Sequence, residues 1–233
     1  MSFTMKAVVG VTVAAACLSA TACGGSSDPL AGMTGKQIAA KAMSDLKSAP
    51  SFTLTGTGIP FQGKTATMSV GMAGKDCTMS VDIGSAGTMT MVMIGTSAWM
   101  KADADFLKTE DGSDGSAIAF LVAGKYLKIP ASSMSGLTQG SGVCDRNGLD
   151  SSLSGLSPSS NVTKGTPTTV NGQKVYPLAD KADKTTFYVT DTSTPWIIKF
   201  VDTKSGEAGQ ATITYGVPKS ITAPSASETV SLP

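Results

Sequence analysis

Between residues 64 and 94, apolar and polar side chains alternate in three short runs. The apolar positions are Ala66, Met68, Val70 and Met72, then Cys77, Met79, Val81 and Ile83, and finally Met89, Met91 and Met93. A period of two is typical of β-strands that bury one face. The separators at residues 73–76 and 84–87 have the length and composition of hairpin turns. The runs therefore predict an antiparallel meander whose inner face is rich in methionine.

A helix is predicted over residues 34–47. Thr34 and Gln37 have the spacing of a capping box, and Pro50 forbids a longer helix. Its apolar positions recur at helical spacing and comprise Ile38, Ala39, Ala42, Met43 and Leu46. We expect this face to cover the sheet that follows.

Further extended segments continue the pattern. They are residues 52–55, 97–101, 126–129, 166–170, 174–178, 187–189, 196–201 and 211–215. Asn171-Gly172 predicts a type I′ turn, and Trp196, Ile198 and Phe200 are expected on one face. About nine or ten strands without βαβ alternation predict an α+β fold, a highly curved antiparallel sheet (a half-barrel) covered on its concave side by helices.

Residues 1–22 have the pattern of a secretory signal peptide, with Lys6 before an apolar stretch and small residues before Cys23. Residues 20–23 resemble a bacterial lipobox, although Ala20 stands where leucine is usual. The pattern predicts lipidation (palmitate or similar acyl chains) at Cys23, which would hold the protein on the extracytoplasmic face of the bacterial cell membrane. Ordinary cleavage after Ala22 would instead release a free protein, and Cys17 is a weaker rival lipidation site.

The expected organisation is a signal peptide at 1–22, a lipidated tether at 23–33 and a single domain at 34–233. Residues 24–32 are small and polar and are expected to be a structureless linker. A chain of 233 residues that is 41% hydrophobic can bury one core. Serine-rich residues 150–161 are expected to form a loop that could act as a lid.

The mature chain is predicted to be nearly neutral. Removal of Lys6 with the signal leaves 17 basic and 17 acidic residues, which argues against a nucleic-acid partner. Two cysteines, Cys77 and Cys144, remain, and in an exported chain an even pair predicts a disulfide. Two buried free thiols are the alternative.

The sequence contains few of the residues and motifs that enzymes use for catalysis. The chain has no histidine, which excludes Ser-His-Asp and Cys-His nucleophiles and histidine metal sites. Ser44-x-x-Lys47 matches one motif of penicillin-recognising enzymes, but the accompanying motifs fail in spacing and composition. The acidic side chains from Asp103 to Asp114 lack EF-hand spacing. We therefore expect no enzyme, no cofactor and no metal site.

Several segments together resemble the actinobacterial LppX/LprG-type lipoproteins, which share a LolA-like half-barrel. The resemblance rests on residues 34–47 leading into 51–58, then 97–103, 126–130, 195–200 and 211–218. It implies a hydrophobic cavity between sheet and helices that binds or carries lipids. It implies no catalytic residue.

The predicted function is that of a membrane-anchored envelope lipoprotein that binds a lipid or another apolar small molecule in a methionine-rich cavity. The predicted cavity residues are Met68, Met72, Met79, Val81, Met89, Met91 and Met93. Methionine suits surfaces that accept ligands of variable shape. Alternatively these side chains fill a core, and the protein is an interaction module that docks a partner protein of the envelope.

Overall fold

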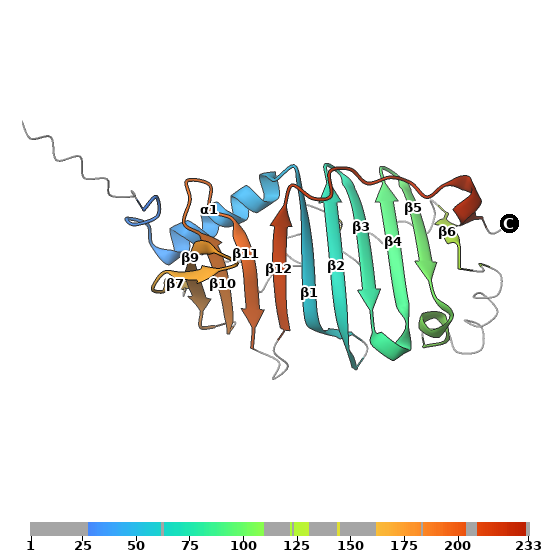
Figure 1. Cartoon of the computed structure of the whole chain (residues 1–233), viewed down its shortest axis with the longest axis horizontal. Helices are drawn as coiled ribbons and strands as arrows, with labels where there is room; N and C mark the ends of the chain where they lie inside the picture. Colours follow the sequence, from blue (N-terminus) through green and yellow to red (C-terminus); the bar gives the residue numbers. More distant parts are fainter. Residues whose placement is uncertain are drawn as a thin grey trace, which may run out of the picture.

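The computed structural model describes residues 28–61, 63–109, 122, 124–130, 144, 162–182, 184–203 and 209–231. In these residues one long helix, α1 (Gly35–Ser48), precedes a single sheet of thirteen strands (Figure 1). The strands are β1 (Ser51–Phe61), β2 (Lys64–Ala73), β3 (Asp76–Asp82), β4 (Thr88–Ile94), β5 (Ser97–Ala102), β6 (Tyr126–Ile129), β7 (Val162–Lys164), β8 (Thr168–Val170), β9 (Gln173–Asp180), β10 (Thr185–Thr190), β11 (Ile197–Asp202), β12 (Gly209–Tyr215) and β13 (Thr229–Val230).

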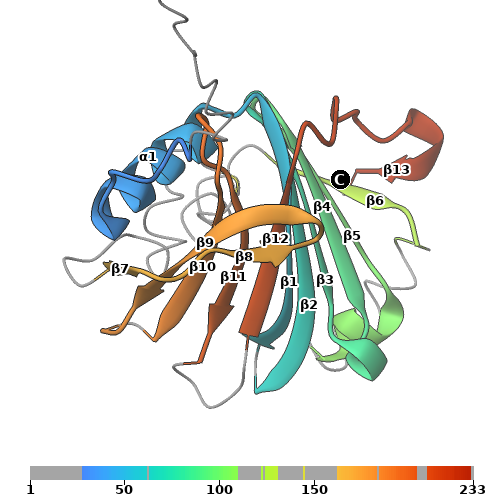
Figure 2. The same cartoon turned by 60° about the vertical axis from the view of Figure 1, so that its left-hand side comes forward.

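The sheet is continuous, strongly curved and almost wholly antiparallel (Figure 2). Its order is β13-β6-β5-β4-β3-β2-β1-β12-β11-β10-β9-β7, with β8 paired to β9. The pairing of β13 with β6 is parallel. The predicted α+β half-barrel is therefore confirmed for the sheet. Its strand count is higher than expected, and the additional strands include β7, which is only three residues long and lies outside the predicted extended segments.

Strand β1 lies in the middle of the sheet and joins the N-terminal meander to the C-terminal strands. Phe52 pairs with Met72 of β2 on one side and with Tyr215 of β12 on the other. Side chains directly opposite in antiparallel strands share a face. We call the face that carries these three side chains the inner face, because the main core cluster lies on it, and the opposite face the outer face.

Helix α1 begins and ends as predicted. Thr34 is the N-cap, and its hydroxyl accepts a hydrogen bond from the backbone N–H of Gln37 (3.3 Å), while the Gln37 side chain accepts one from the Thr34 N–H (2.9 Å). This capping box satisfies two donors that the first turn leaves without helical partners. The predicted apolar face is buried, from Ile38 to Leu46.

The position of α1 differs from the expectation. Its main contacts are with β7, β10 and β11, so the helix covers the part of the sheet that comes last in the chain instead of the meander that follows it. Gly35 explains the close approach. A Cβ atom there would lie 2.8 Å from the backbone nitrogen of Lys164 and 2.9 Å from the carbonyl oxygen of Val162. Helical cover of the inner face is thus shown for only part of the sheet.

The folded domain begins before residue 34, the first residue predicted for it. The expectation of a structureless linker over 24–32 is wrong from Asp28 onward, because Leu30 is 1% exposed and belongs to the core. Lys164 of β7 holds this segment against the sheet, since its ammonium donates a hydrogen bond of 2.7 Å to the Leu30 carbonyl. Cys23, the predicted signal peptide and the serine-rich residues 150–161 lie outside the described residues.

Candidate functional site

The inner face of β2, β3 and β4 carries three rows of apolar side chains. The rows are Met72-Cys77-Met93, Val70-Met79-Met91 and Met68-Val81-Met89. All seven predicted cavity residues stand in these rows, as the alternation in the sequence requires. The structure therefore gathers them in one continuous patch, which we call the methionine face.

Most of the methionine face is packed. Met72, Met79, Val81, Met91 and Met93 are at most 8% exposed, whereas Met68 and Met89 are half-buried. Met68 and Met89 touch both the main core cluster and a second cluster around Val81 and Phe106. They are therefore the members of the patch whose side chains are most open.

Cys77 and Cys144 form a disulfide at one end of the methionine face, on its middle strand. Their Cα atoms are 5.5 Å apart, and the bond joins positions 67 residues apart in sequence. Cys77 is fully buried between Met72 and Met93. Cys144 therefore contacts the sheet from the inner side, and the disulfide joins it to the end row of the methionine face.

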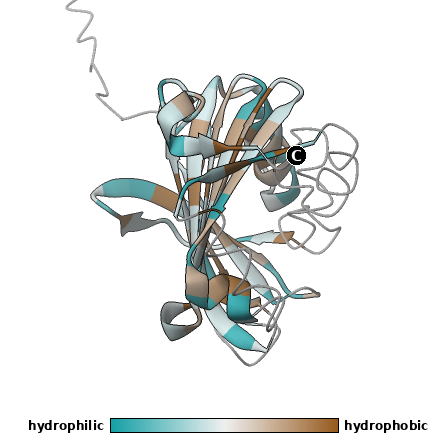
Figure 3. Cartoon of the chain, turned by 90° about the vertical axis from the view of Figure 1, so that its right-hand side faces the viewer, coloured by the Kyte–Doolittle hydropathy of each residue, from teal (hydrophilic) through white to brown (hydrophobic). Residues whose placement is uncertain are grey.

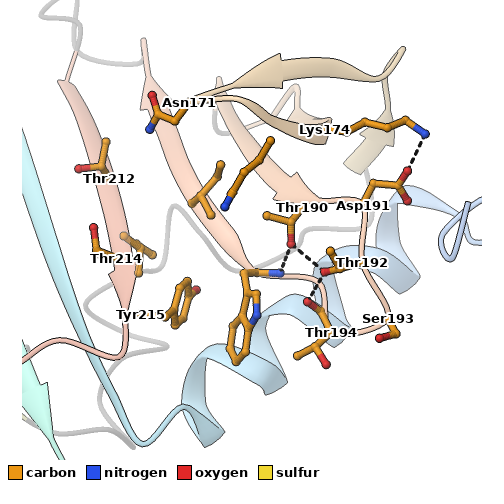
Figure 4. Close-up of a pocket in the computed structure, with 14 residues that line it drawn as sticks. Asn171, Lys174, Thr190, Asp191, Thr192, Ser193, Thr194, Thr212, Thr214 and Tyr215 are labelled. Atoms are coloured by element: carbon orange, nitrogen blue, oxygen red, sulfur yellow. Dashed lines mark hydrogen bonds and ion pairs between the residues drawn. The ribbon is translucent and has the colours of Figure 1, made fainter. Parts of the chain in front are cut away.

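A pocket of about 780 Å³ opens on the other side of the sheet (Figure 4). Its lining comprises Asn171, Gln173, Lys174, Thr190, Asp191, Thr192, Ser193, Thr194, Trp196, Ile198, Thr212, Ile213, Thr214 and Tyr215. Thr212 and Thr214 are exposed, while their neighbours Ala211 and Ile213 are in the inner core. The pocket therefore opens on the outer face at Thr212 and Thr214, and it borders the core at Ile213 and Tyr215; none of the methionine-face residues lines it.

The β8–β9 hairpin forms one wall of this outer pocket. Asn171 and Gly172 have φ values of 50° and 76°, which the predicted type I′ turn requires at both central residues. The hairpin stands out from the sheet with a hydrophilic tip (Figure 3), and in the view of Figure 2 it lies in front of the C-terminal strands.

A threonine-rich loop after β10 forms the opposite wall. The Thr190 hydroxyl accepts a hydrogen bond from the Trp196 backbone N–H (2.9 Å) and lies 3.0 Å from the Thr192 hydroxyl. The Thr192 hydroxyl in turn donates to the Thr194 carbonyl (2.5 Å). These bonds hold the loop in a fixed shape around the base of the pocket (Figure 4).

A β-bulge sends Ile198 to this pocket. The register of β10 and β11 shifts between Tyr188 and Val189, so that Ile197, not Ile198, pairs with Val189 and joins the core. The expectation that Trp196, Ile198 and Phe200 share a face is therefore wrong for Ile198. Trp196 and Phe200 both pack against the main core cluster, whereas Ile198, the extra residue of the bulge, lies outside that cluster and lines the pocket.

Beside the pocket, four side chains form a charged cluster. Lys174 Nζ lies 2.6 Å from Asp191 Oδ2 and 3.8 Å from Asp28 Oδ2, and the Tyr176 hydroxyl donates a hydrogen bond to Asp28 Oδ2. That hydrogen bond is the main reason why the pKa of Asp28 falls to about 2, and it also raises the pKa of Tyr176. Hydrogen bonding to Asp191 raises the pKa of Lys174. The cluster holds the first described residue of the chain onto β9.

The low pKa of Asp28 predicts acid sensitivity. Because the carboxyl titrates near 3.8 when unperturbed and near 2 in the fold, its contribution to stability is complete above pH 3.8 and is lost as pH falls towards 2. Asp28→Asn should therefore unfold at lower urea concentration than the wild type at neutral pH, and the difference should disappear near pH 2. Asp105→Asn, whose side chain is 68% exposed, is the matched control. A difference that does not change with pH would contradict the assignment.

The alternating pattern identified the methionine face, but both the outer pocket and the charged cluster were missed. Asn171-Gly172 was a usable signal for the hairpin wall. The alternate threonines Thr190, Thr192 and Thr194 were another signal, since they cannot continue a buried strand. Asp28 gave no local signal, because its partners lie about 150 residues away in sequence.

The acidic side chains of the described ranges do not assemble into a metal centre. Within those ranges no group of three or more His, Cys, Asp or Glu side chains could hold a metal ion. Asp103 has a structural role instead, since its carboxylate accepts hydrogen bonds from the backbone N–H groups of Thr88 (2.7 Å) and Phe106 (2.8 Å). None of the helices in the described part of the chain is long and apolar enough to cross a membrane.

Comparison with known proteins identifies the fold. No family model matches the chain, and no curated protein matches it. The solved structure of LprF from Mycobacterium bovis is similar, with a TM-score of 0.51 and 12% identity over 82% of this chain and 97% of that chain. An uncharacterized conserved protein from Thermus thermophilus superimposes less well, with a TM-score of 0.37 and 9% identity over 84% and 98% of the two chains. The predicted likeness to the LppX/LprG-type fold is confirmed by LprF.

Proposed function

We propose that this protein is an extracytoplasmic lipoprotein, anchored to the cell membrane through Cys23, that binds a lipid or similar apolar ligand on its inner face. The observation that carries the proposal is the methionine face, an uninterrupted apolar patch on three adjacent strands. The shared fold with LprF supports a common architecture. The function itself is inferred from the chemistry of the patch.

The methionine face has the properties that an acyl-chain site needs. Thioether side chains are unbranched and polarizable, so they adapt to flexible chains of variable length. Burial of each ligand methylene contributes about 0.8 kcal/mol, and the rows contain no charged side chain. Helix α1 has its main contacts with β7, β10 and β11. A ligand would therefore reach the patch most readily at Met68 and Met89, its two half-buried members.

Native mass spectrometry of the full chain, extracted from bacterial membranes in mild detergent, tests the proposal. We expect the protein to carry added mass that organic solvent removes and fragmentation identifies as lipid. Met89→Trp should reduce the bound fraction severalfold, because an indole at this half-buried position occupies the space that the ligand would use. Thr90→Trp, the next residue on the opposite face of β4, is the matched control and should bind as the wild type does. A chain that stays free of lipid after incubation with mixed lipid vesicles would refute the proposal.

The burial of the methionine face supports a second candidate function. Five of its seven predicted cavity residues are at most 8% exposed, as expected for a filled core. A protein with a filled core and the same anchor would be an envelope module that docks a partner protein. Absence of bound lipid, together with recovery of one specific partner after cross-linking in intact cells, would favour this second function.

A further inference from the structure

We propose that the outer pocket binds a neutral saccharide. The pocket opens beside Thr212 and Thr214 on the outer face and none of the methionine-face residues lines it, so the inference is independent of the lipid-binding proposal. The argument rests on the charge of the pocket, on the chemistry of its walls and on the aromatic side chain at its base.

The pocket offers no net charge to a ligand. Of the described residues that line it, Lys174 and Asp191 alone carry formal charge. They are already paired with each other at 2.6 Å, and Asp191 is 4% exposed. A phosphate, a sulfate or a strongly basic ligand would have to disrupt this pair. The lining therefore selects against highly charged molecules.

The walls present many groups that both donate and accept hydrogen bonds. Thr212 and Thr214 are exposed on β12, Asn171 and Gln173 are exposed at the tip of the β8–β9 hairpin, and Ser193 is exposed on the loop after β10. Hydroxyl and amide side chains match the hydroxyl groups of a sugar, which also donate and accept. Alternate residues of one strand are roughly 7 Å apart on the same face, so Thr212 and Thr214 can contact successive hydroxyl groups of one saccharide (Figure 4).

Trp196 and Tyr215 supply the apolar part of the lining, at the edge where the pocket meets side chains that pack against the inner core cluster. The Trp196 ring lies against that of Tyr215, with centroids 4.3 Å apart, and the Tyr215 hydroxyl donates a hydrogen bond to the Ile197 carbonyl (3.0 Å). Trp196 is half-buried, so it is held rigidly and still contributes to the pocket lining. A rigid, amphipathic ring beside an array of hydroxyl groups fits the apolar face of a saccharide at small entropic cost.

Titration of the full chain in detergent with soluble oligosaccharides tests this inference. The probes are neutral tetrasaccharides of glucose, mannose, galactose and arabinose, with sulfated and amino-sugar oligosaccharides as charged comparisons. We expect at least one neutral probe to bind and to change the fluorescence of Trp196, measured in a Trp99→Phe background. Phosphatidylcholine vesicles with and without a neutral glycolipid form a second arm. Binding only to the glycolipid vesicles would identify a lipid headgroup as the source of the saccharide.

Two variants assign the binding to the pocket. The double substitution Thr212→Val and Thr214→Val keeps the shape and β-propensity of both residues but removes their hydroxyl groups, so affinity should fall about tenfold. Thr57→Val is the matched control, because Thr57 is exposed on the neighbouring strand, pairs with Gln210 and lies outside the pocket. Three results would each overturn the proposal. The protein could bind a charged probe more tightly than the neutral ones, it could bind no neutral probe in either arm, or the double variant could bind with unchanged affinity. Lipid occupancy in native mass spectra should be unaffected by the double variant, so the two proposals fail separately.

Discussion

Replacement of both Cys77 and Cys144 by alanine is expected to lower the free energy of unfolding by about 4 kcal/mol, since the disulfide closes a loop of this length in the unfolded chain. The bond joins positions 67 residues apart, and without it the denatured state gains conformational entropy. Alanine is the better replacement at position 77, because that side chain is fully buried and a serine hydroxyl there would add a desolvation cost. Urea unfolding of the oxidised wild type and of the double variant measures the difference.

Reduction of the wild type provides the control for this prediction. Dithiothreitol should lower the urea midpoint of the wild type to near that of the Cys77→Ala, Cys144→Ala variant and should leave the variant unchanged. Equal midpoints for the oxidised wild type and the variant would show that Cys77 and Cys144 do not stabilise the fold as a pair. Lipid occupancy of the same samples would then report whether the disulfide at the end of the methionine face also affects ligand binding.

The parts of the fold that could be predicted from sequence are those encoded by near neighbours. The capping box of α1 involves residues three apart, Thr34 and Gln37, and the hairpin turn needs only Asn171 and Gly172. The methionine face followed from the period of two, because side chains on a regular strand must alternate. Each of these signals operates within a few residues of chain.

The features that were missed depend on contacts between distant segments. Helix α1 packs on β7, β10 and β11, a choice that the approach of Gly35 to Lys164 makes possible but that no local pattern reveals. The bulge beside Val189 is set by pairing between strands, and it gives Ile197 the core position opposite Val189 that the alternation predicts for Ile198. The outer pocket depends on both the bulge and the hairpin. The alternation of apolar and polar residues could therefore not predict it.

Strand β12 shows how one segment can serve two sites. Ala211 and Ile213 belong to the inner core, while Thr212 and Thr214 are exposed in the lining of the outer pocket, which Ile213 also borders. Because alternate residues face opposite sides of the sheet, the two faces can change independently in chemistry. An apolar site on the inner face and a polar site on the outer face are therefore compatible in one layer of strands.

Leu46→Ala is expected to lower the free energy of unfolding by about 2–5 kcal/mol, the usual cost of truncating a buried leucine. Leu46 is 0% exposed in the last turn of α1 and belongs to the main core cluster. Its loss would leave a cavity where the helix packs on the sheet. Ser44→Ala, on the exposed side of the same helix, is the matched control and should change stability by no more than about 0.5 kcal/mol.

Urea unfolding at neutral pH measures both variants, and native mass spectra of the same samples measure bound lipid. If Leu46→Ala costs less than about 1 kcal/mol, well below the range for buried leucines, then α1 is not packed on the sheet as the structure has it. If stability falls but lipid occupancy is retained, the helix supports the fold without contributing to the ligand site. If stability and lipid occupancy both fall in Leu46→Ala while Ser44→Ala retains them, α1 helps to enclose the methionine face. The cover of the inner face is then part of the binding site.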